Sequence, residues 1–339
     1  MVTTASTLEF QRGEHHIGSL PILVIHAHSS CNCRCIMCDI WRTRDTKIFG
    51  VRELEPQLDS IRRLGVRWIV FSGGEPLMNP ELFQVCSILR AEGIRLTLLS
   101  TGLLLKKHAS AVASSFEDVI VSLDGPERIH DKIRRVDGAF GLLQEGVIAL
   151  RDERSSMQIT ARTTVQKANH AHLVGTAEAA KQLSLNGISY LAVDVASPAF
   201  NRPILLPINR QDELSLTLAE LAVLEKEIRT LTEISQKELA PGLIVESPEK
   251  LHRIVRHFRA HLGLESSVAP NCNAPWVSAV IEVDGEVRPC FFHPTIGNLK
   301  DTTLENVINS KKGRNFRHEL DIPNNSVCRN CVCSLNYRA

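Results

Sequence analysis

Four cysteines stand close together near the start of the chain: Cys31, Cys33, Cys35 and Cys38. Where thiols stay reduced, clustered cysteines bind metal more often than they form disulfides. Three thiolates spaced as Cys31-x3-Cys35-x2-Cys38 suit a cubane iron–sulfur cluster whose fourth iron is open to an outside ligand. A structural zinc ion would need a fourth protein ligand, which Cys33 can supply, so zinc remains an alternative.

A second group of cysteines lies near the end of the chain, spaced as Cys272-x12-Gly285-x4-Cys290 and Cys328-x2-Cys331-x-Cys333. The first pair flanks a hairpin whose turn is marked by Asp284-Gly285. These cysteines are enough for a four-thiolate site, either an iron–sulfur cluster or a zinc ribbon. The ligands we select are Cys272, Cys290, Cys328 and Cys331, with Cys333 as the alternative for the last place. Cys86 lies in an amphipathic helical stretch and is predicted to be a core residue.

Six short apolar runs rich in β-branched residues can position the first loop. They are separated by helical stretches, which is the pattern of parallel strands joined by crossover helices. We therefore expect an α/β fold: a partial (β/α)6 barrel of the TIM type, followed by a small C-terminal α+β iron–sulfur module. The predicted strands are residues 20–28, 67–73, 94–100, 118–123, 157–165 and 188–195.

The remaining chain divides by its helical pattern and its cysteines. Residues 210–234 and 247–263 are predicted helices, and the hairpin SAVIEVDGEVRPC opens the cysteine-bearing section. The expected domains are an N-terminal extension (1–19), the barrel (20–209), a helical linker (210–264) and the auxiliary module (265–339).

Polar and glycine-rich segments follow several predicted strands. In barrels of this kind the loops after the strands form the active-site face, so these segments should meet at one mouth. The segments are Phe71-Ser72-Gly73-Gly74-Glu75-Pro76, Ser100-Thr101-Gly102, Ser122-Leu123-Asp124-Gly125 and Thr163-Thr164-Val165.

The combination of the cysteine loop, the Gly73-Gly74-Glu75-Pro76 motif and the Ser122 to Arg134 segment resembles the radical S-adenosylmethionine (SAM) superfamily. The C-terminal spacing resembles that superfamily's SPASM or shortened "twitch" auxiliary-cluster module. The resemblance implies a [4Fe-4S] cluster held by three cysteines and SAM, an auxiliary [4Fe-4S] cluster, and an enzyme that abstracts hydrogen with a 5′-deoxyadenosyl radical. It also implies that SAM is bound by Met37, Ser72, Gly73, Gly74, Glu75, Ser100, Ser122, Asp124, Arg134 and Val165.

Two positions depart from that family's usual pattern. Met37 replaces an aromatic residue beside the third cysteine, although a thioether can still pack on the adenine ring. Thr101 stands where relatives have asparagine. Cys33 has no counterpart in the motif, and we expect it to be dispensable.

Composition argues against several partner classes. The formal net charge is +1, which gives no bulk attraction to nucleic acid or to an anionic membrane. The N-terminus lacks a signal peptide's basic and apolar regions, and no run of about 18 apolar residues occurs. We therefore expect a cytoplasmic protein. The family resemblance implies, in addition, an electron donor such as flavodoxin or ferredoxin.

The substrate is expected to be a small molecule, because few residues precede Cys31 and the C-terminal module is short. Length and loop placement are similar to the cytosylglucuronic acid decarboxylases of nucleoside antibiotic biosynthesis. That resemblance implies a carbon–carbon lyase that converts this sugar-acid nucleoside to cytosylarabinopyranose. The alternatives are a radical alcohol dehydrogenase of an aminocyclitol or sugar, a SPASM-type peptide maturase, and a zinc-binding interaction protein.

A substrate carboxylate calls for a guanidinium group. The candidates that we select are Arg134, Arg135, Arg162 and Arg202. Glu282 and Asp284, in the predicted hairpin, are expected to be solvated.

Overall fold

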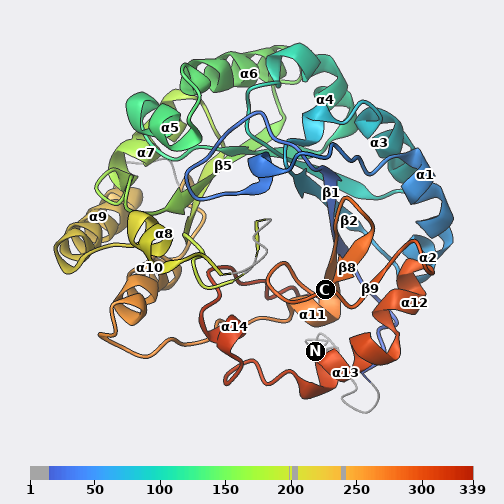
Figure 1. The fold of residues 1–339 in the computed structure, drawn as a ribbon. Coiled ribbons are helices and arrows are strands. Elements are labelled where there is room, and N and C mark those ends of the chain that lie inside the picture. The colour runs from blue at the N-terminus through green and yellow to red at the C-terminus, as the bar shows by residue number, and fades with distance from the viewer. Residues whose placement is uncertain (1–14, 198, 201–204, 238–241, 339) are drawn as a thin grey trace, which may run out of the picture.

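Six parallel strands with helices on their outer side form a partial barrel (Figure 1). The computed structural model describes residues 15–197, 199–200, 205–237 and 242–338. All six predicted strands are confirmed, and they pair in chain order. They are β1 (Ile22–His28), β2 (Trp68–Gly73), β3 (Arg95–Ser100), β4 (Asp118–Ser122), β5 (Gln158–Val165) and β6 (Gly187–Ala192).

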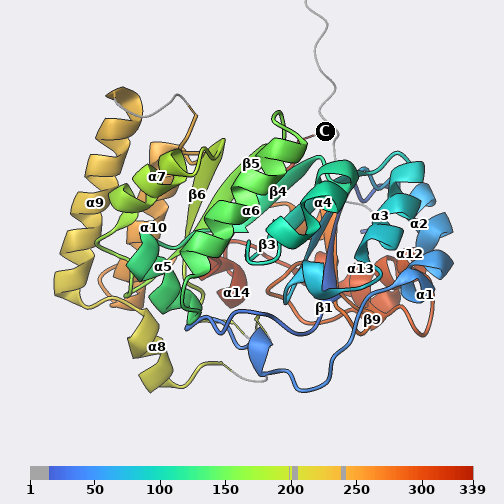
Figure 2. The same ribbon diagram turned by 90° about the horizontal axis from the view of Figure 1, so that it is seen from above.

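The helices between the strands cover the outside of the sheet, as Figure 2 shows for α4 and α6. Successive side chains of a strand point to opposite faces, so every second residue packs under the helices. Phe71 of β2, for example, is fully buried, and its ring meets Phe116 edge to face. Burying such a side chain stabilises the fold by about 1.5–3 kcal/mol. These helices are α1 (Val51–Leu54), α2 (Leu58–Arg63), α3 (Leu82–Ala91), α4 (Ala109–Ser115), α5 (Glu127–Arg134), α6 (Ala139–Glu153) and α7 (Leu173–Gln182).

The C-terminal hairpin continues the barrel sheet. Strand β7 (Ser278–Ile281) pairs in parallel with β1, and β8 (Glu286–Arg288) and β9 (Gly297–Asn298) extend the sheet to nine strands. The predicted turn at Asp284-Gly285 is confirmed, because β7 and β8 are antiparallel and Gly285 has a φ of 87°. The small module is therefore attached to the barrel through backbone hydrogen bonds, which places its residues beside those of β1.

The single helix predicted for residues 210–234 is wrong, since the structure has two helices there, α8 (Ile208–Leu214) and α9 (Leu218–Lys237). The second begins at a capping box: Thr217 N donates to Glu220 Oε2 at 2.8 Å, and Glu220 N donates to Thr217 Oγ1 at 3.3 Å. Such a box favours starting a new helix at this point over continuing the previous one.

The other C-terminal helices complete the module. The predicted helix at 247–263 is confirmed as α10 (Pro248–His261). After it come α11 (Ala274–Val277), α12 (Leu304–Ile308), α13 (Lys311–Glu319) and α14 (Ser326–Arg329). Among the described residues, none of the helices has the length and apolar character needed to cross a membrane.

Candidate active site

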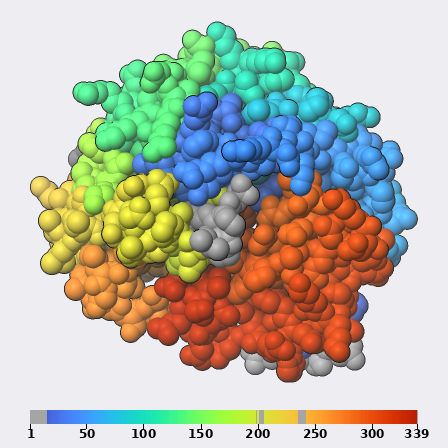
Figure 3. Space-filling model, in the orientation of Figure 1, coloured from blue at the N-terminus to red at the C-terminus, as the bar shows by residue number. Residues whose placement is uncertain are grey.

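The first cysteine loop leaves the carboxyl end of β1 and packs on the end of α5. Arg34 N donates to the carbonyl of Arg134 at 3.0 Å, and Ile36 N donates to the carbonyl of Ile133 at 3.1 Å. In Figure 3 the segment after β1, coloured blue, meets the yellow segment around α8 and the orange C-terminal module on one face of the molecule. The loop therefore lies where the barrel, α5 and the C-terminal module converge.

The thiols of this loop occupy unequal environments. Cys33 and Cys35 are buried, whereas Cys31 and Cys38 are half-buried. The pKa of Cys35 is lowered to about 6 by a hydrogen bond from Cys33 and by the nearby Arg134 guanidinium, against the opposing effect of burial. The pKa of Cys33 is raised by its hydrogen bonds to Cys31 and Cys35. Cys35 is thus more readily ionised than Cys33, as a thiolate ligand must be.

Three of these sulfurs are enough for an iron–sulfur cluster, whereas a structural zinc ion would need a fourth protein ligand. A zinc ion needs its ligands to converge on one centre, whereas each thiolate of a cubane cluster binds a different iron. That cluster would be held by Cys31, Cys35 and Cys38. Cys33 is predicted not to be a ligand, although it hydrogen-bonds to Cys31 and Cys35.

Gly73 and Gly74 bring the loop after β2 against the cysteine loop. A Cβ atom at Gly74 would lie 1.9 Å from the carbonyl oxygen of Ser30, and Gly73 has a φ of 113°. Gly74 N donates to the carbonyl of His28 at 2.8 Å. These glycines are therefore needed first for the close contact between the two loops. The sequence interpretation had explained them by the approach of a ligand. Their contact with SAM remains a prediction.

The Glu75 carboxylate is fully buried and already accepts three hydrogen bonds. Its donors are Thr101 N at 2.7 Å, Ser100 Oγ at 2.9 Å and Leu77 N at 3.1 Å. Burial raises its pKa, against those hydrogen bonds. The carboxylate joins the ends of β2 and β3, so it holds the two loops that would flank a ligand. Contact between Glu75 and the amino group of SAM is likewise a prediction.

Asp124 and Arg134 form a buried ion pair beside the cysteine loop. Asp124 Oδ2 lies 2.5 Å from Arg134 Nη2, and Arg134 Nη1 donates to Cys35 Sγ at 3.4 Å. The other oxygen, Asp124 Oδ1, accepts from Thr164 N at 2.9 Å, which joins β4 to β5. Burial raises the pKa of Asp124, although Arg134 opposes this. Two of the predicted SAM-binding residues are thus brought together with a predicted cluster ligand.

The other predicted SAM-binding residues lie around the same edge of the sheet. Met37 is half-buried against the core, and Ser72 and Ser122 are half-buried strand ends. Val165 is fully buried at the end of β5. The predicted binding roles of these residues remain predictions.

A cavity of about 570 Å³ lies between the segments that flank the cysteine loop, residues 28–29 and 40–47, and the C-terminal hairpin. Gly73 and Gly74 reach it from the barrel, Lys47 from the segment after the cysteine loop, and Arg288 and Phe291 from the hairpin. The Phe291 ring packs against Phe200, with centroids 5.0 Å apart. The hairpin therefore supplies one wall of the cavity.

His26 and Glu282 are cavity residues that the sequence interpretation missed. His26 Nδ1 lies 2.6 Å from Glu282 Oε2, and Glu282 Oε1 accepts from Arg288 Nε at 2.8 Å. Expecting Glu282 to be solvated was wrong, since only 22% of its side chain is exposed. The position of His26 near the end of β1 could have marked it as a candidate site residue. Its partner could not be found from the sequence, because the pairing of β1 with β7 was not predicted. Asp284 is more exposed and lies 4.0 Å from Lys47.

The arginines selected from the sequence to bind a substrate carboxylate are, where the structure describes them, not among the residues that line the large cavity. Arg134 is engaged by Asp124 and Cys35, Arg135 and Arg162 are exposed, and Arg202 lies outside the described residues. Arg44, Lys47 and Arg288 line the large cavity, the first two from the segment after the cysteine loop and the third from the hairpin.

The predicted auxiliary ligands come together in the C-terminal module. Cys272, Cys290, Cys328 and Cys331 all line one small pocket, whereas Cys333 is exposed. Burial raises the pKa of Cys290 to about 12 and that of Cys328 to about 11. Thiols in such surroundings ionise when a cation binds them, which fits an iron–sulfur cluster. Assigning these four as the ligands, with Cys333 outside, remains a prediction.

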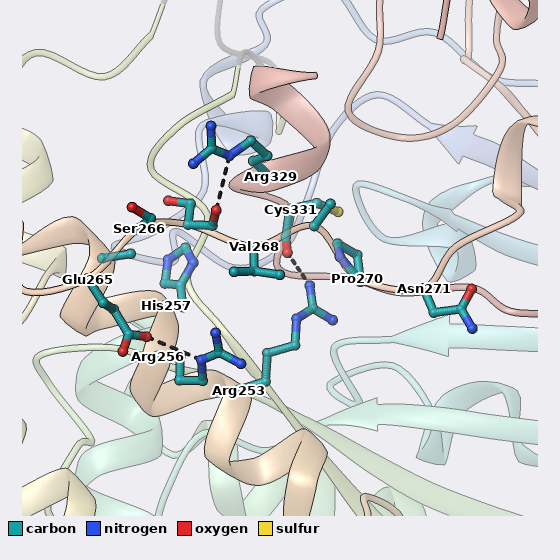
Figure 4. Close-up of a pocket in the computed structure, with 13 residues that line it drawn as sticks. Arg253, Arg256, His257, Glu265, Ser266, Val268, Pro270, Asn271, Arg329 and Cys331 are labelled. Carbon is teal, nitrogen blue, oxygen red and sulfur yellow. Dashed lines mark hydrogen bonds and ion pairs between the residues drawn. The ribbon is translucent and has the colours of Figure 1, made fainter. Parts of the chain in front are cut away.

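A second cavity, of about 240 Å³, lies between α10 and the C-terminal cysteine segment and is drawn in Figure 4. Arg253 of α10 donates to the backbone carbonyls of Cys331 and Cys333, and Arg329 Nε donates to the carbonyl of Ser267 at 3.0 Å. The Arg253 contacts attach the C-terminal cysteine segment to α10, and the Arg329 contact attaches it to the loop that follows α10. Arg253 is thus a structural support for the auxiliary site.

Cys86 is fully buried in α3, as predicted for a core residue.

Comparison with known families covers both halves of the site. The Radical SAM superfamily matches residues 27–180, and SPASM, described as an iron–sulfur cluster-binding domain, matches residues 272–332. The first match contains the cysteine loop and the glycine motif, and the second contains the auxiliary cysteines from Cys272 to Cys331.

Individual relatives have different functions. The AdoMet-dependent heme synthase of Methanosarcina barkeri is 26% identical over 296 residues, covering 82% of this chain and 79% of that protein. The cysteine-type anaerobic sulfatase-maturating enzyme of Clostridium novyi is 24% identical over 340 residues, covering 92% and 85%. Streptococcus suis SuiB bound to precursor peptide SuiA has the same fold, with a TM-score of 0.65 and 15% identity over 94% of this chain and 72% of that one.

Proposed function

Because the chain is a radical SAM enzyme with a C-terminal SPASM domain, we propose that it acts on a small polar substrate bearing a carboxylate. The specific reaction that we propose is decarboxylation of cytosylglucuronic acid to cytosylarabinopyranose. The observation that carries the proposal is the cavity of about 570 Å³ between the hairpin and the segments that flank the cysteine loop. Cavities of roughly 300–1,000 Å³ suit small-molecule ligands.

When bound, the cluster and SAM supply the one-electron reduction that yields a 5′-deoxyadenosyl radical. The chain's own residues have the tasks of binding and orientation. Arg44 and Lys47 offer cations to the substrate carboxylate, and the paired rings of Phe200 and Phe291 offer an apolar surface to a flat base. A substrate in this cavity would lie beside the backbone of Gly73 and Gly74, which packs against the start of the cysteine loop.

The test is anaerobic incubation of reconstituted enzyme with SAM, dithionite and cytosylglucuronic acid. We expect 5′-deoxyadenosine together with a product lighter by one carbon dioxide. Formation of 5′-deoxyadenosine with unchanged cytosylglucuronic acid would contradict the proposed reaction. A product lighter by two hydrogens would identify an alcohol dehydrogenase.

A second candidate function is modification of a peptide. It is supported by the sulfatase-maturating relative, whose match covers 92% of this chain. The same assay with a cysteine-containing sulfatase peptide would distinguish the two functions, because only a maturase would change the peptide's mass. The zinc-binding interaction protein is set aside, since the chain is a radical SAM enzyme.

A further inference from the structure

His26 and Glu282 come together because β1 and β7 are adjacent parallel strands. The register pairs Ile25 with Ile281. His26 and Glu282 are the residues that directly follow this pair, so they stand beside each other. His26 Nδ1 lies 2.6 Å from Glu282 Oε2, and both residues line the large cavity. This pair joins the barrel to the C-terminal module at the proposed substrate site.

We propose that His26 and Glu282 form a proton-transfer dyad that accepts a proton from the substrate bound in this cavity. The proposal rests on the proposed function, because it requires a substrate hydroxyl on the carbon that loses its hydrogen atom. It adds a specific proton acceptor that the radical chemistry alone does not identify.

The hydrogen bonds of the dyad leave one ring nitrogen available. A carboxylate accepts from Nδ1–H, so the pairing with Glu282 selects the tautomer in which His26 Nε2 is the acceptor. Nε2 is buried and has no hydrogen-bond partner in the part of the chain that the structure describes. A buried polar atom without a partner is costly unless a ligand satisfies it. The His26 side chain as a whole is only 8% exposed.

Glu282 is itself held in place by Arg288. The guanidinium Nε donates to Glu282 Oε1 at 2.8 Å, and Arg288 Nη1 donates to the carbonyl of His293 at 3.1 Å. Burial opposes ionisation of Glu282, but its hydrogen bond with His26 and the charge of Arg288 lower its pKa overall. The carboxylate is therefore an anion that orients the imidazole.

The proton step balances without a further electron acceptor. Removal of a hydrogen atom from a hydroxyl-bearing carbon leaves an α-hydroxyalkyl radical, which is more acidic than the parent alcohol. Its O–H bond breaks, the bonding electron pair stays on oxygen, and the proton forms the Nε2–H bond of His26. The products are a ketyl radical anion and an imidazolium paired with Glu282. Proton transfer of this kind typically contributes about 10²–10⁴-fold to a rate.

The first experiment compares His26→Gln and Glu282→Gln with the wild-type holoenzyme, using cytosylglucuronic acid deuterated on its hydroxyl-bearing carbons. We expect His26→Gln to keep its iron content and to transfer deuterium into 5′-deoxyadenosine, while product formation falls by about 10²-fold or more. Glu282→Gln should show a smaller loss, since it acts by positioning. Glu305→Gln is the matched control, because Glu305 also pairs with an arginine, Arg63, at 2.6 Å.

The outcomes separate the dyad from the reaction. If the wild-type enzyme forms product and His26→Gln forms it equally fast, the dyad is refuted and the decarboxylase stands. If the wild-type enzyme leaves cytosylglucuronic acid unchanged, the decarboxylase function is refuted. The dyad proposal is then tested by a measurement that needs no substrate. That measurement is ¹⁵N NMR of histidine-labelled, oxidised holoenzyme, with His26 assigned from its missing signals in His26→Gln. The Nδ1–H tautomer, lost in Glu282→Gln, is expected; an Nε2–H tautomer would overturn the proposal.

Discussion

Arg134 Nη1 donates a hydrogen bond to Cys35 Sγ over 3.4 Å while Arg134 Nη2 lies 2.5 Å from Asp124 Oδ2. One buried guanidinium therefore connects the cysteine loop to the end of β4. The charge of Asp124, which is fully buried, is compensated by this arginine, of which only 7% is exposed.

Replacing Arg134 by leucine should destabilise the apoprotein strongly. Breaking a buried ion pair by removing one partner costs about 3–5 kcal/mol, because the other charge is left buried. Urea unfolding of Arg134→Leu and of Arg134→Leu/Asp124→Asn measures this, and the double variant should recover part of the loss. Equal stability of Arg134→Leu and wild type would contradict the role of the pair.

A methyl group at Gly74 should prevent the cysteine loop from docking. The added Cβ would meet the Ser30 carbonyl at 1.9 Å, and this backbone atom cannot move aside cheaply. We expect Gly74→Ala to lose most of its iron after reconstitution and to melt at a lower temperature. Gly141→Ala is the control: no heavy atom lies within 4 Å of its added Cβ. Because Gly141 is inside α6, alanine there should stabilise by about 0.5–1 kcal/mol.

Cys33→Ala should retain the first cluster, whereas Cys35→Ala should lose it. Three thiolates are enough when SAM occupies the fourth iron, and Cys33 has no place in the motif. Iron analysis should give about eight irons for wild type and Cys33→Ala and about four for Cys35→Ala, if each cluster has four irons. Loss of iron from Cys33→Ala would show that its contacts with Cys31 and Cys35 are ligand contacts.

Cys331→Ala should lose the auxiliary cluster and Cys333→Ala should keep it. Cys331 lines the pocket shared with Cys272, Cys290 and Cys328, while Cys333 is exposed. Electron paramagnetic resonance of the reduced variants, with the first cluster as internal standard, reads out the second cluster directly. The reverse pattern would make Cys333 the fourth ligand.

Stability should fall as the pH drops from about 6.5 towards 4, because several enclosed histidines resist protonation, among them the half-buried His257 and the fully buried His130. Burial, with the charges of His261 and Arg253, lowers the pKa of His257 to about 4; burial and Arg134 lower that of His130 to about 3. The unfolded chain binds these protons near pH 6.5, so below that value each histidine destabilises the fold by about 1.4 kcal/mol per pH unit until its folded pKa is reached.

Urea unfolding of the apoprotein at pH 7, 6 and 5 measures this dependence. His257→Gln should flatten the curve relative to wild type, since glutamine does not titrate. Parallel curves for the two proteins would contradict the assignment to His257.

Much of the barrel and the position of the cysteine loop could be predicted from the sequence. Apolar runs separated by amphipathic stretches specify parallel strands locally, and loops after such strands necessarily share one edge. The cysteine spacings are local as well, which is why they predicted two iron–sulfur sites. The division of residues 208–237 into two helices was also readable from Thr217 and Glu220, but the apolar periodicity concealed it.

The partnership of His26 with Glu282 was decided only by the tertiary structure. It depends on β7 pairing with β1, a contact between segments 256 residues apart in the chain. No local pattern encodes that register, because strand pairing is set by which surfaces can be buried together. The sequence by itself determined the barrel, its cysteine loops and their chemical type, since these follow from neighbouring residues. The tertiary structure decided which side chains of the C-terminal module face the barrel, and hence the cavity in which the chemistry would occur.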